Sequence, residues 1–131
     1  MEVDIITTSW GYVALALSEN GVYAVSLPHD NPNDALKVIN FELNPQKSEL
    51  FCQTAELLKK YFSGENVNFS KLPLDLSWAS PFSRRVYQEL LKVPFGATIT
   101  YRELAVKAGN PRAARAVGRA MATNKISVII P

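Results

Sequence analysis

The sequence predicts an α/β (α+β) N-terminal domain with an antiparallel hairpin or sheet and a helix, followed by a mainly helical domain with a helix-turn-helix. Three patterns lead to this expectation. Apolar and polar residues alternate through residues 3–27, apolar residues recur at helical spacing after residue 48, and two short helix signals flank a tight glycine turn beyond residue 100. A polar, proline-containing connector over residues 65–80 predicts domains at residues 1–79 and 80–131.

The N-terminal pattern predicts strands around Val3 and Ile5, over residues 12–17 and over residues 22–27. The last two flank Ser-Glu-Asn-Gly at residues 18–21, and Asn-Gly is a strong signal for a tight hairpin. These two strands are therefore expected to pair in antiparallel fashion, and the segment from Pro28 to Pro32 is expected to be a loop.

Two longer helices follow. The first is predicted from Ser48 to Phe62, with Gly64 as its stop. The second is capped by Ser80, begins at Pro81 and ends at Pro-Phe-Gly, residues 94–96. Its expected buried stripe consists of Phe82, Val86, Leu90 and Val93.

The helix-turn-helix is predicted from the capping residues. Thr100 and Glu103 form a capping-box pattern that starts a short helix, and Gly109 is suited to end it. Asn110 is then expected to cap a second helix whose first residue is Pro111. Two short helices joined by such a turn are typical of DNA-binding helix-turn-helix units.

The second of these short helices has three predicted faces. At about 100° per residue, its arginines fall within roughly 60° of one another, namely Arg112, Arg115 and Arg119. The opposite side, which is expected to be buried, consists of Ala114, Val117, Gly118 and Met121. Between them lies a small-residue flank that would let the backbone approach another surface, formed by Ala113, Ala116 and Ala120.

Charge is distributed unevenly along the chain. Residues 1–81 carry five Lys/Arg and ten Asp/Glu, whereas residues 82–131 carry nine Lys/Arg and two Asp/Glu. A basic C-terminal part either forms a solvated face or contacts a polyanion. Together with the helix-turn-helix pattern, the charge favours DNA binding.

Several classes of protein are excluded. No run of about 18 apolar residues predicts a membrane span. One cysteine, Cys52, cannot form an internal disulfide and fits a reducing cytoplasm, and with the single His29 it cannot complete a zinc site. No metal or cofactor is expected. Between apolar neighbours in its helix, Cys52 itself is expected to be a small buried residue.

Residues 80–131 resemble the alkylguanine-DNA alkyltransferases, also called methylated-DNA–protein-cysteine methyltransferases. The residues that carry the resemblance are the entry helix at 82–90, Pro-Phe-Gly at 94–96, Thr100-Tyr101, residues 109–118, Asn124, and Ile-Ile-Pro at 129–131. Residues 1–79 resemble the N-terminal domain of this family by pattern only.

The resemblance implies DNA repair by irreversible transfer of an alkyl group from O6 of guanine to a protein cysteine, after the nucleotide is flipped out from the minor groove. In the family that cysteine lies in a Pro-Cys-His-Arg motif, and the chain stops at the matching Pro131. A buried-type apolar strand at residues 128–131 is an unusual terminus. The chain is therefore interpreted as a fragment, and residues 1–131 are predicted to be inactive, with no catalytic nucleophile present.

The resemblance also implies roles for individual residues. Arg115 would fill the gap left by the flipped guanine, Tyr101 would press on the target phosphate, and Asn124 would brace the turn near the cysteine. Tyr101 could instead be a packed aromatic, and Asn124 a plain helix cap. The remaining predicted DNA contacts are Ser83, Thr100, Arg102, Asn110, Arg112, Ala113, Ala114, Ala116, Gly118 and Arg119.

The implied partner is double-stranded DNA that contains alkylated guanine, bound by a monomer in the cytoplasm, or in the nucleus of a eukaryote, without membrane contact. Two alternatives stay open. One is a sensor that recognises alkylated guanine without repairing it. The other is a helix-turn-helix regulator, although Ala and Arg offer little base-specific readout. Lys125 and Ser127 replace prolines that the family often has, which leaves the range of alkyl groups open.

Overall fold

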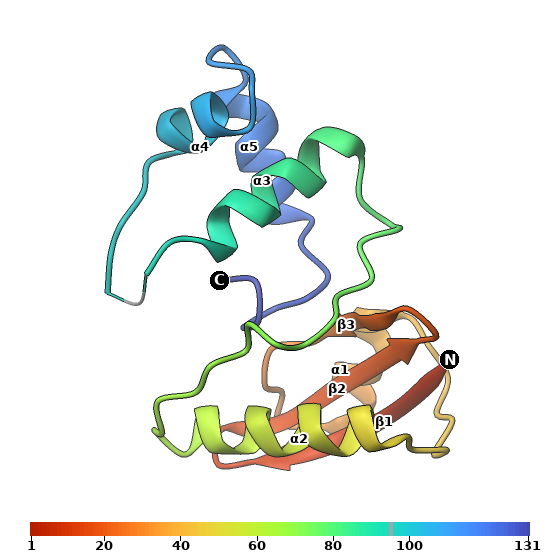
Figure 1. The fold of residues 1–131 in the computed structure, drawn as a ribbon. Helices are drawn as coiled ribbons and strands as arrows, with labels where there is room; N and C mark the ends of the chain where they lie inside the picture. Colours follow the sequence, from red (N-terminus) through yellow and green to blue (C-terminus); the bar gives the residue numbers. More distant parts are fainter. Residues whose placement is uncertain (95) are drawn as a thin grey trace. The chain divides into compact units, whose positions relative to one another are not determined.

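The computed structural model describes residues 1–94 and 96–131 (Figure 1). By packing, these residues divide into two compact units. Unit 1 comprises Met1–Asp75 and Lys125–Ile129, and unit 2 comprises Leu76–Asn124 and Ile130–Pro131. The predicted fold class, a sheet-containing N-terminal part followed by a helical part, is confirmed. The domain boundary after residue 79 stays a prediction.

Unit 1 contains a three-stranded antiparallel sheet in the order β1-β2-β3. The strands are β1 (Glu2–Thr8), β2 (Gly11–Ser18) and β3 (Gly21–Val25). Ser18 pairs with Gly21, so the predicted hairpin between residues 18 and 21 is confirmed. Alternation along β2 directs small alanines to one face of the sheet and larger apolar side chains to the other.

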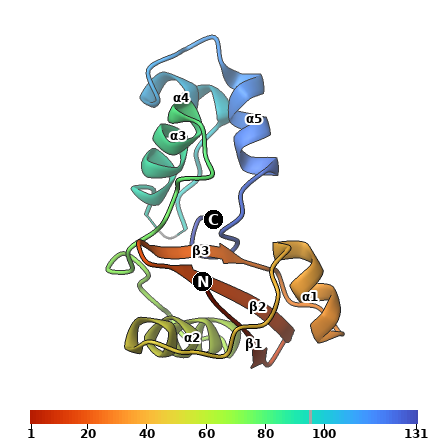
Figure 2. The same ribbon diagram turned by 90° about the vertical axis from the view of Figure 1, so that its right-hand side faces the viewer.

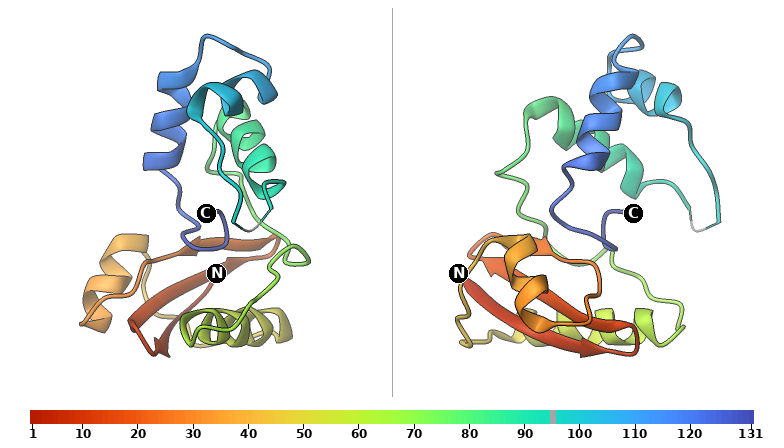
Figure 3. Two further views of the ribbon diagram at one scale, coloured as in Figure 1. Left: turned by 90° about the vertical axis from the view of Figure 1, so that its left-hand side faces the viewer. Right: turned by 180° about the vertical axis from the view of Figure 1, so that it is seen from behind.

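A helix covers each face of this sheet, α1 (Pro32–Ile39) on one side and α2 (Glu49–Phe62) on the other (Figures 1 and 3). The sheet contributes three small residues to the face toward α1, where Ala14, Ala16 and Ala24 cluster with Ala35 and Ile39 of that helix. Sequence reasoning missed α1. Its signals were present, since the Asn31 side chain accepts a hydrogen bond from the Asn33 amide and Pro32 is the first helical residue.

Helix α2 begins and ends as predicted, with the Ser48 hydroxyl accepting a hydrogen bond from the Phe51 amide. Within α2, the side chains of Phe51 and Leu58 are fully buried. The prediction that Cys52 is buried is wrong, because its side chain is exposed. Cys52 follows Phe51 by one position, and about 100° of helical rotation carries it off the stripe that faces the sheet.

Part of the predicted connector over residues 65–80 belongs to unit 1. Leu74 bridges to Val22 in parallel fashion, and the buried carboxylate of Asp75 accepts a hydrogen bond from the Ser18 hydroxyl. A Cβ atom at Gly21 would lie 2.3 Å from the Pro73 carbonyl oxygen, so this close approach requires glycine.

A second segment, near the C-terminal end, also pairs with β3. Val25 forms a parallel bridge with Ile126. The apolar strand predicted over residues 128–131 is wrong. Residues 127–129 form a turn instead, in which Val128 adopts a positive φ of 73°.

Unit 2 consists of α3 (Pro81–Leu91), α4 (Tyr101–Lys107) and α5 (Ala114–Ala122), which pack against one another (Figure 2). Ser80 caps α3 as predicted, since its hydroxyl accepts a hydrogen bond from the Ser83 amide. Helix α3 ends at Leu91, and Phe95 of the predicted stop lies outside the described residues. Of the expected stripe, Val86 and Leu90 are buried whereas Phe82 and Val93 are half-buried.

The largest buried side chain of unit 2 is Tyr87, which the predicted stripe omitted. Its hydroxyl donates a hydrogen bond to the Ala120 carbonyl oxygen and thereby joins α3 to α5. Its ring lies 5.5 Å from that of Trp78, centroid to centroid. Within residues 1–94 and 96–131, none of the helices has the length and apolar character needed to span a bilayer.

Candidate nucleic-acid interface

Helix α4 places Tyr101 at its first position. The Thr100 hydroxyl accepts a hydrogen bond from the Glu103 amide at 3.1 Å, which confirms the predicted cap. Because a first-turn residue projects from the helix start, the Tyr101 side chain remains 51% exposed. Arg102 follows it and is also exposed.

The turn between α4 and α5 differs from the prediction. Asn110 does not cap α5 and Pro111 does not begin it, because α5 begins at Ala114 and no side chain caps it. The Asn110 side-chain oxygen instead accepts a hydrogen bond from the Arg112 amide at 3.2 Å, which closes a separate turn. Arg112 is exposed but lies outside the helix, so its predicted helical angle does not apply.

The side chains that α5 buries also differ from the predicted set. Val117 is buried as expected, but Ala120 is buried as well and Ala114 is exposed. The Tyr87 hydroxyl donates a hydrogen bond to the Ala120 carbonyl and so joins this part of α5 to α3. Arg115 and Arg119 remain exposed on the outer side, and we call these two residues the arginine ridge.

On one side of the arginine ridge lies the Tyr101 ring. A Cβ atom placed on Gly118 would lie 3.5 Å from Cε2 of Tyr101, so the ring covers this glycine at van der Waals distance. A longer side chain at position 118 would displace the ring. The structure thus brings together Tyr101 and Gly118, and Arg115 lies one helical turn before Gly118.

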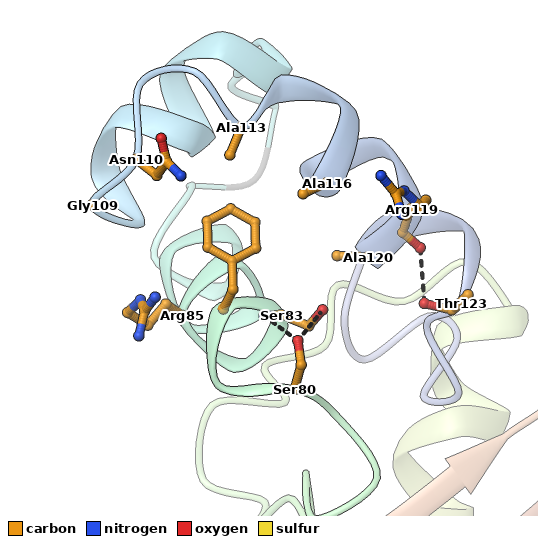
Figure 4. Close-up of a pocket in the computed structure, with 11 residues that line it drawn as sticks. Ser80, Ser83, Arg85, Gly109, Asn110, Ala113, Ala116, Arg119, Ala120 and Thr123 are labelled. Carbon is orange, nitrogen blue, oxygen red and sulfur yellow. Dashed lines mark hydrogen bonds between the residues drawn. The ribbon is translucent and has the colours of Figure 1, made fainter.

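On the other side of the arginine ridge is an open groove of about 630 Å³ between α3, the Asn110 turn and α5 (Figure 4). We call it the α3–α5 groove. It includes five of the predicted contact residues, Ser83, Asn110, Ala113, Ala116 and Arg119. Its other lining residues were not predicted as contacts, and they are Ser80, Phe82, Arg85, Gly109, Ala120 and Thr123.

Arg85 is the functional candidate that sequence reasoning missed. Its Nε atom donates a hydrogen bond to the Ala108 carbonyl oxygen at 3.0 Å, and its guanidinium carbon lies 5.8 Å from the centre of the Phe82 ring. Both contacts fix the orientation of the side chain. The partner carbonyl lies 23 positions away in the sequence, so no local pattern could have indicated it.

Asn124 ties the end of α5 to the end of the chain. Its Nδ2 atom donates a hydrogen bond to the Ile130 carbonyl oxygen at 2.9 Å. Thr123 reinforces the same helix end, since its hydroxyl donates to the Arg119 carbonyl oxygen at 2.8 Å. The backbone of Ile130 is therefore held beside α5 within unit 2.

The electrostatics of unit 2 favour an anion. It carries eight Lys/Arg and two Asp/Glu, whereas unit 1 carries six and ten. No carboxylate lines the α3–α5 groove among its described residues. Exposed guanidiniums beside small side chains and hydroxyls are typical of surfaces that contact nucleic-acid backbones.

Two family models match the chain. Residues 3–76 match the 6-O-methylguanine DNA methyltransferase, ribonuclease-like domain. Residues 81–131 match the 6-O-methylguanine DNA methyltransferase, DNA binding domain. The second match contains α3, α4, α5 and the α3–α5 groove apart from Ser80.

Individual relatives agree with the family models. A probable methylated-DNA–protein-cysteine methyltransferase of Acanthamoeba polyphaga mimivirus is 34% identical over the whole chain, which covers 78% of that protein. A methylated-DNA–protein-cysteine methyltransferase of Methanosarcina barkeri is 36% identical, and the match covers 100% of this chain and 79% of that protein. Among solved structures, Mycobacterium tuberculosis OGT in complex with DNA superimposes with a TM-score of 0.78 at 30% identity, covering 100% of this chain and 75% of that one.

Proposed function

The chain belongs to the 6-O-methylguanine DNA methyltransferase family, and from this premise we propose that it binds alkylated duplex DNA through unit 2 and flips the damaged nucleotide from the minor groove. The observation that carries the proposal is the arginine ridge of α5, flanked by the Tyr101 ring on one side. Because the neighbouring residues are Ala and Gly, the helix backbone can closely approach a minor groove that is widened beyond its ordinary width of about 6 Å.

In this proposal Arg115 enters the stack when the target nucleotide leaves it. Removing a base from the stack costs a few kcal/mol, and an inserted side chain offsets part of that cost. Tyr101 is suited to contact the adjacent phosphate, because its ring is held against Gly118 while half of its surface stays accessible. Replacing either side chain would leave the packed core of unit 2 intact.

The proposed reaction is a direct transfer of the alkyl group. A cysteine thiolate attacks the alkyl carbon, a sulfur–carbon bond forms, the bond from that carbon to guanine O6 breaks, and the departing guanine gains a proton. By family resemblance this step belongs to the cysteine of a Pro-Cys-His-Arg motif whose proline corresponds to Pro131, and Asn124 holds the backbone of the preceding Ile130 beside α5. Asn124 therefore acts as a positioning residue in this proposal.

Cys52, the single cysteine within residues 1–131, is not the proposed acceptor. Its side chain is exposed on α2 of unit 1, and the two grooves that it lines are formed by unit 1 residues alone. No residue of α4 or α5 lines either groove.

A fluorescence experiment tests the proposal. The duplex carries O6-methylguanine with 2-aminopurine as its neighbour, and the increase in 2-aminopurine emission at saturating protein reports flipping. Arg115→Ala should lower the flipped fraction about tenfold, because the vacated stack is no longer filled. The matched control Arg119→Ala removes the same charge one turn along α5 and should flip normally once saturated.

Equal emission from both variants at saturation would refute the role of Arg115. Mass spectrometry of the same complexes should show no alkyl group on Cys52. A stoichiometric S-methyl adduct on that cysteine would refute the assignment of the acceptor.

A further inference from the structure

We propose that the α3–α5 groove seats the sugar–phosphate backbone of the DNA strand opposite the alkylated one, with Arg119 and Arg85 as its two cationic contacts. This inference rests on the proposed function, because it assumes that α5 enters the minor groove. The proposed interface then includes both DNA strands. The α3–α5 groove gains a ligand, and Arg85 gains a role that the sequence did not predict.

The chemistry of the groove matches a nucleic-acid backbone. Such a backbone alternates apolar deoxyribose with anionic phosphate. The groove has an apolar part, formed by Phe82 and the alanines of α5, and Figure 4 shows Arg85 and Arg119 at its opposite ends. In the described part of the chain, neither guanidinium forms an ion pair with a carboxylate. Both charges are therefore available to phosphates.

The two arginines differ in how firmly they are held. The Nε atom of Arg85 donates a hydrogen bond to the Ala108 carbonyl and the guanidinium lies over the Phe82 ring, so this cation is held in one orientation at the edge of the groove. Arg119 is anchored only through α5 and is exposed. A phosphate contact by Arg119 can therefore be removed without disturbing the packing of unit 2.

The strand assignment follows from the two sides of α5. With Arg115 as the reference, Gly118 lies about 60° to one side of the helix and Ala116 about 100° to the other. Gly118 is covered by Tyr101, whereas Ala116 lines the α3–α5 groove. A helix seated in the minor groove has one backbone along each side. If Tyr101 faces the target strand, the α3–α5 groove must face its complement.

The experiment combines a protein change with neutralised DNA. Affinity of the complete chain is measured by fluorescence anisotropy for an O6-methylguanine duplex at a series of salt concentrations. Arg119→Ala should weaken binding about tenfold at about 0.1 M salt and reduce the slope of log affinity against log salt by about one, as expected for one lost phosphate contact. Arg119→Lys should retain most of the slope.

The strand is identified with methylphosphonates, which lack the phosphate charge. If they replace the phosphates of the unmodified strand opposite the lesion, Arg119→Ala should cause no further loss of affinity. In the alkylated strand, the same replacement should leave the tenfold loss in place. The control Arg84→Ala removes an exposed arginine of α3 that does not line the groove, and it should leave the slope unchanged.

Two results would overturn the inference while the proposed function stands. One is an unchanged salt slope for Arg119→Ala, and the other is a tenfold loss that persists when the unmodified strand is neutralised. Failure of the proposed function would look different, because the unsubstituted chain itself would then show no salt-dependent affinity for any duplex.

Discussion

Units 1 and 2 use apolar residues and charges in opposite ways. Unit 1 has a sheet covered on both faces, with large fully buried side chains such as Leu15, Leu17 and Phe51, and an excess of acidic residues. Unit 2 has three short helices, an exposed arginine ridge and an excess of basic residues. Most of the largest fully buried side chains thus belong to unit 1, whereas the excess of cations belongs to unit 2.

This separation has a physical reason. A helix that must approach DNA closely needs Ala and Gly on its outer faces, and such residues bury little apolar area. Long cations on the same faces repel one another in the folded state. The larger core of unit 1 carries neither constraint, so substitutions there should affect stability far more than DNA affinity.

The largest effect is expected for Leu15→Ala, at the centre of β2. Leu15 is fully buried, and its truncation should lower the free energy of unfolding by about 2–5 kcal/mol. Leu27→Ala is the matched control, because Leu27 is 58% exposed and should change stability by less than about 0.5 kcal/mol. Urea denaturation measures both. Similar values for the two variants, or weaker DNA binding by the folded Leu15→Ala protein, would contradict the separation.

An intermediate effect is expected for Tyr87→Phe in unit 2. The change removes the hydrogen bond to the Ala120 carbonyl and should lower the free energy of unfolding by about 1–2 kcal/mol. Burial raises the pKa of Tyr87, and a hydrogen bond involving Thr123 lowers it less. Because the folded state favours the neutral phenol, its contribution is complete below the unfolded pKa of about 10 and is lost as pH rises through the higher folded value.

The pH dependence provides the test. The difference in free energy of unfolding between the unsubstituted chain and Tyr87→Phe should be constant near about pH 8 and shrink toward about pH 11. A comparison between the two proteins cancels the contribution of the other tyrosines. A difference that grows with pH would show that the phenol is not stabilised in its neutral form.

The smallest effect is expected for Asp4→Asn in unit 1. The Asp4 carboxylate lies 2.7 Å from Nζ of Lys47. Burial raises the pKa of Asp4, but the hydrogen bonds from Lys47 and from the Ile5 amide outweigh it, so the pKa lies below its ordinary 3.8. The ion pair therefore stabilises the fold above this ordinary value, and the contribution is lost as pH falls through the folded pKa.

Both groups are partly exposed, so the loss should stay below about 1 kcal/mol near neutral pH. Thermal or urea unfolding from about pH 6 to about pH 2 should show a smaller acid dependence for Asp4→Asn than for the unsubstituted chain. Glu56→Gln is the control, because the pair of Glu56 with Lys59 is longer, at 3.8 Å, and more exposed. An equal change in both variants would mean that the Asp4 pair has no special role.

Local signals in the sequence were sufficient for much of unit 1 and for the starts of three helices. The hairpin at residues 18–21 and the caps Ser48, Ser80 and Thr100 depend on neighbours within a few positions, and all are confirmed. Helix α1 has the same kind of signal at Asn31, so its start could also have been predicted from the sequence. Element types follow from short-range chemistry, which a sequence displays directly.

The errors on α5 have a different origin. The predicted faces assume that residues 111–121 form one helix. In the structure, Asn110 closes a separate turn and the helix is Ala114–Ala122. Helix α5 is also joined to α3 by the Tyr87 hydroxyl, a contact across 33 positions. No periodicity within α5 contains that information.

Sequence patterns were enough to infer the two-part fold, the charge contrast, the family and the exposed positions of Arg115 and Arg119. Three contacts could be recognised only in the folded chain: Tyr101 covers Gly118, Arg85 and Arg119 line one groove, and Asn124 donates a hydrogen bond to the Ile130 carbonyl. The difference arises from how far apart in the sequence the interacting residues lie. Caps, turns and helical periods are interactions among near neighbours, whereas the surroundings of each side of α5 are defined by packing between segments that are far apart in the sequence.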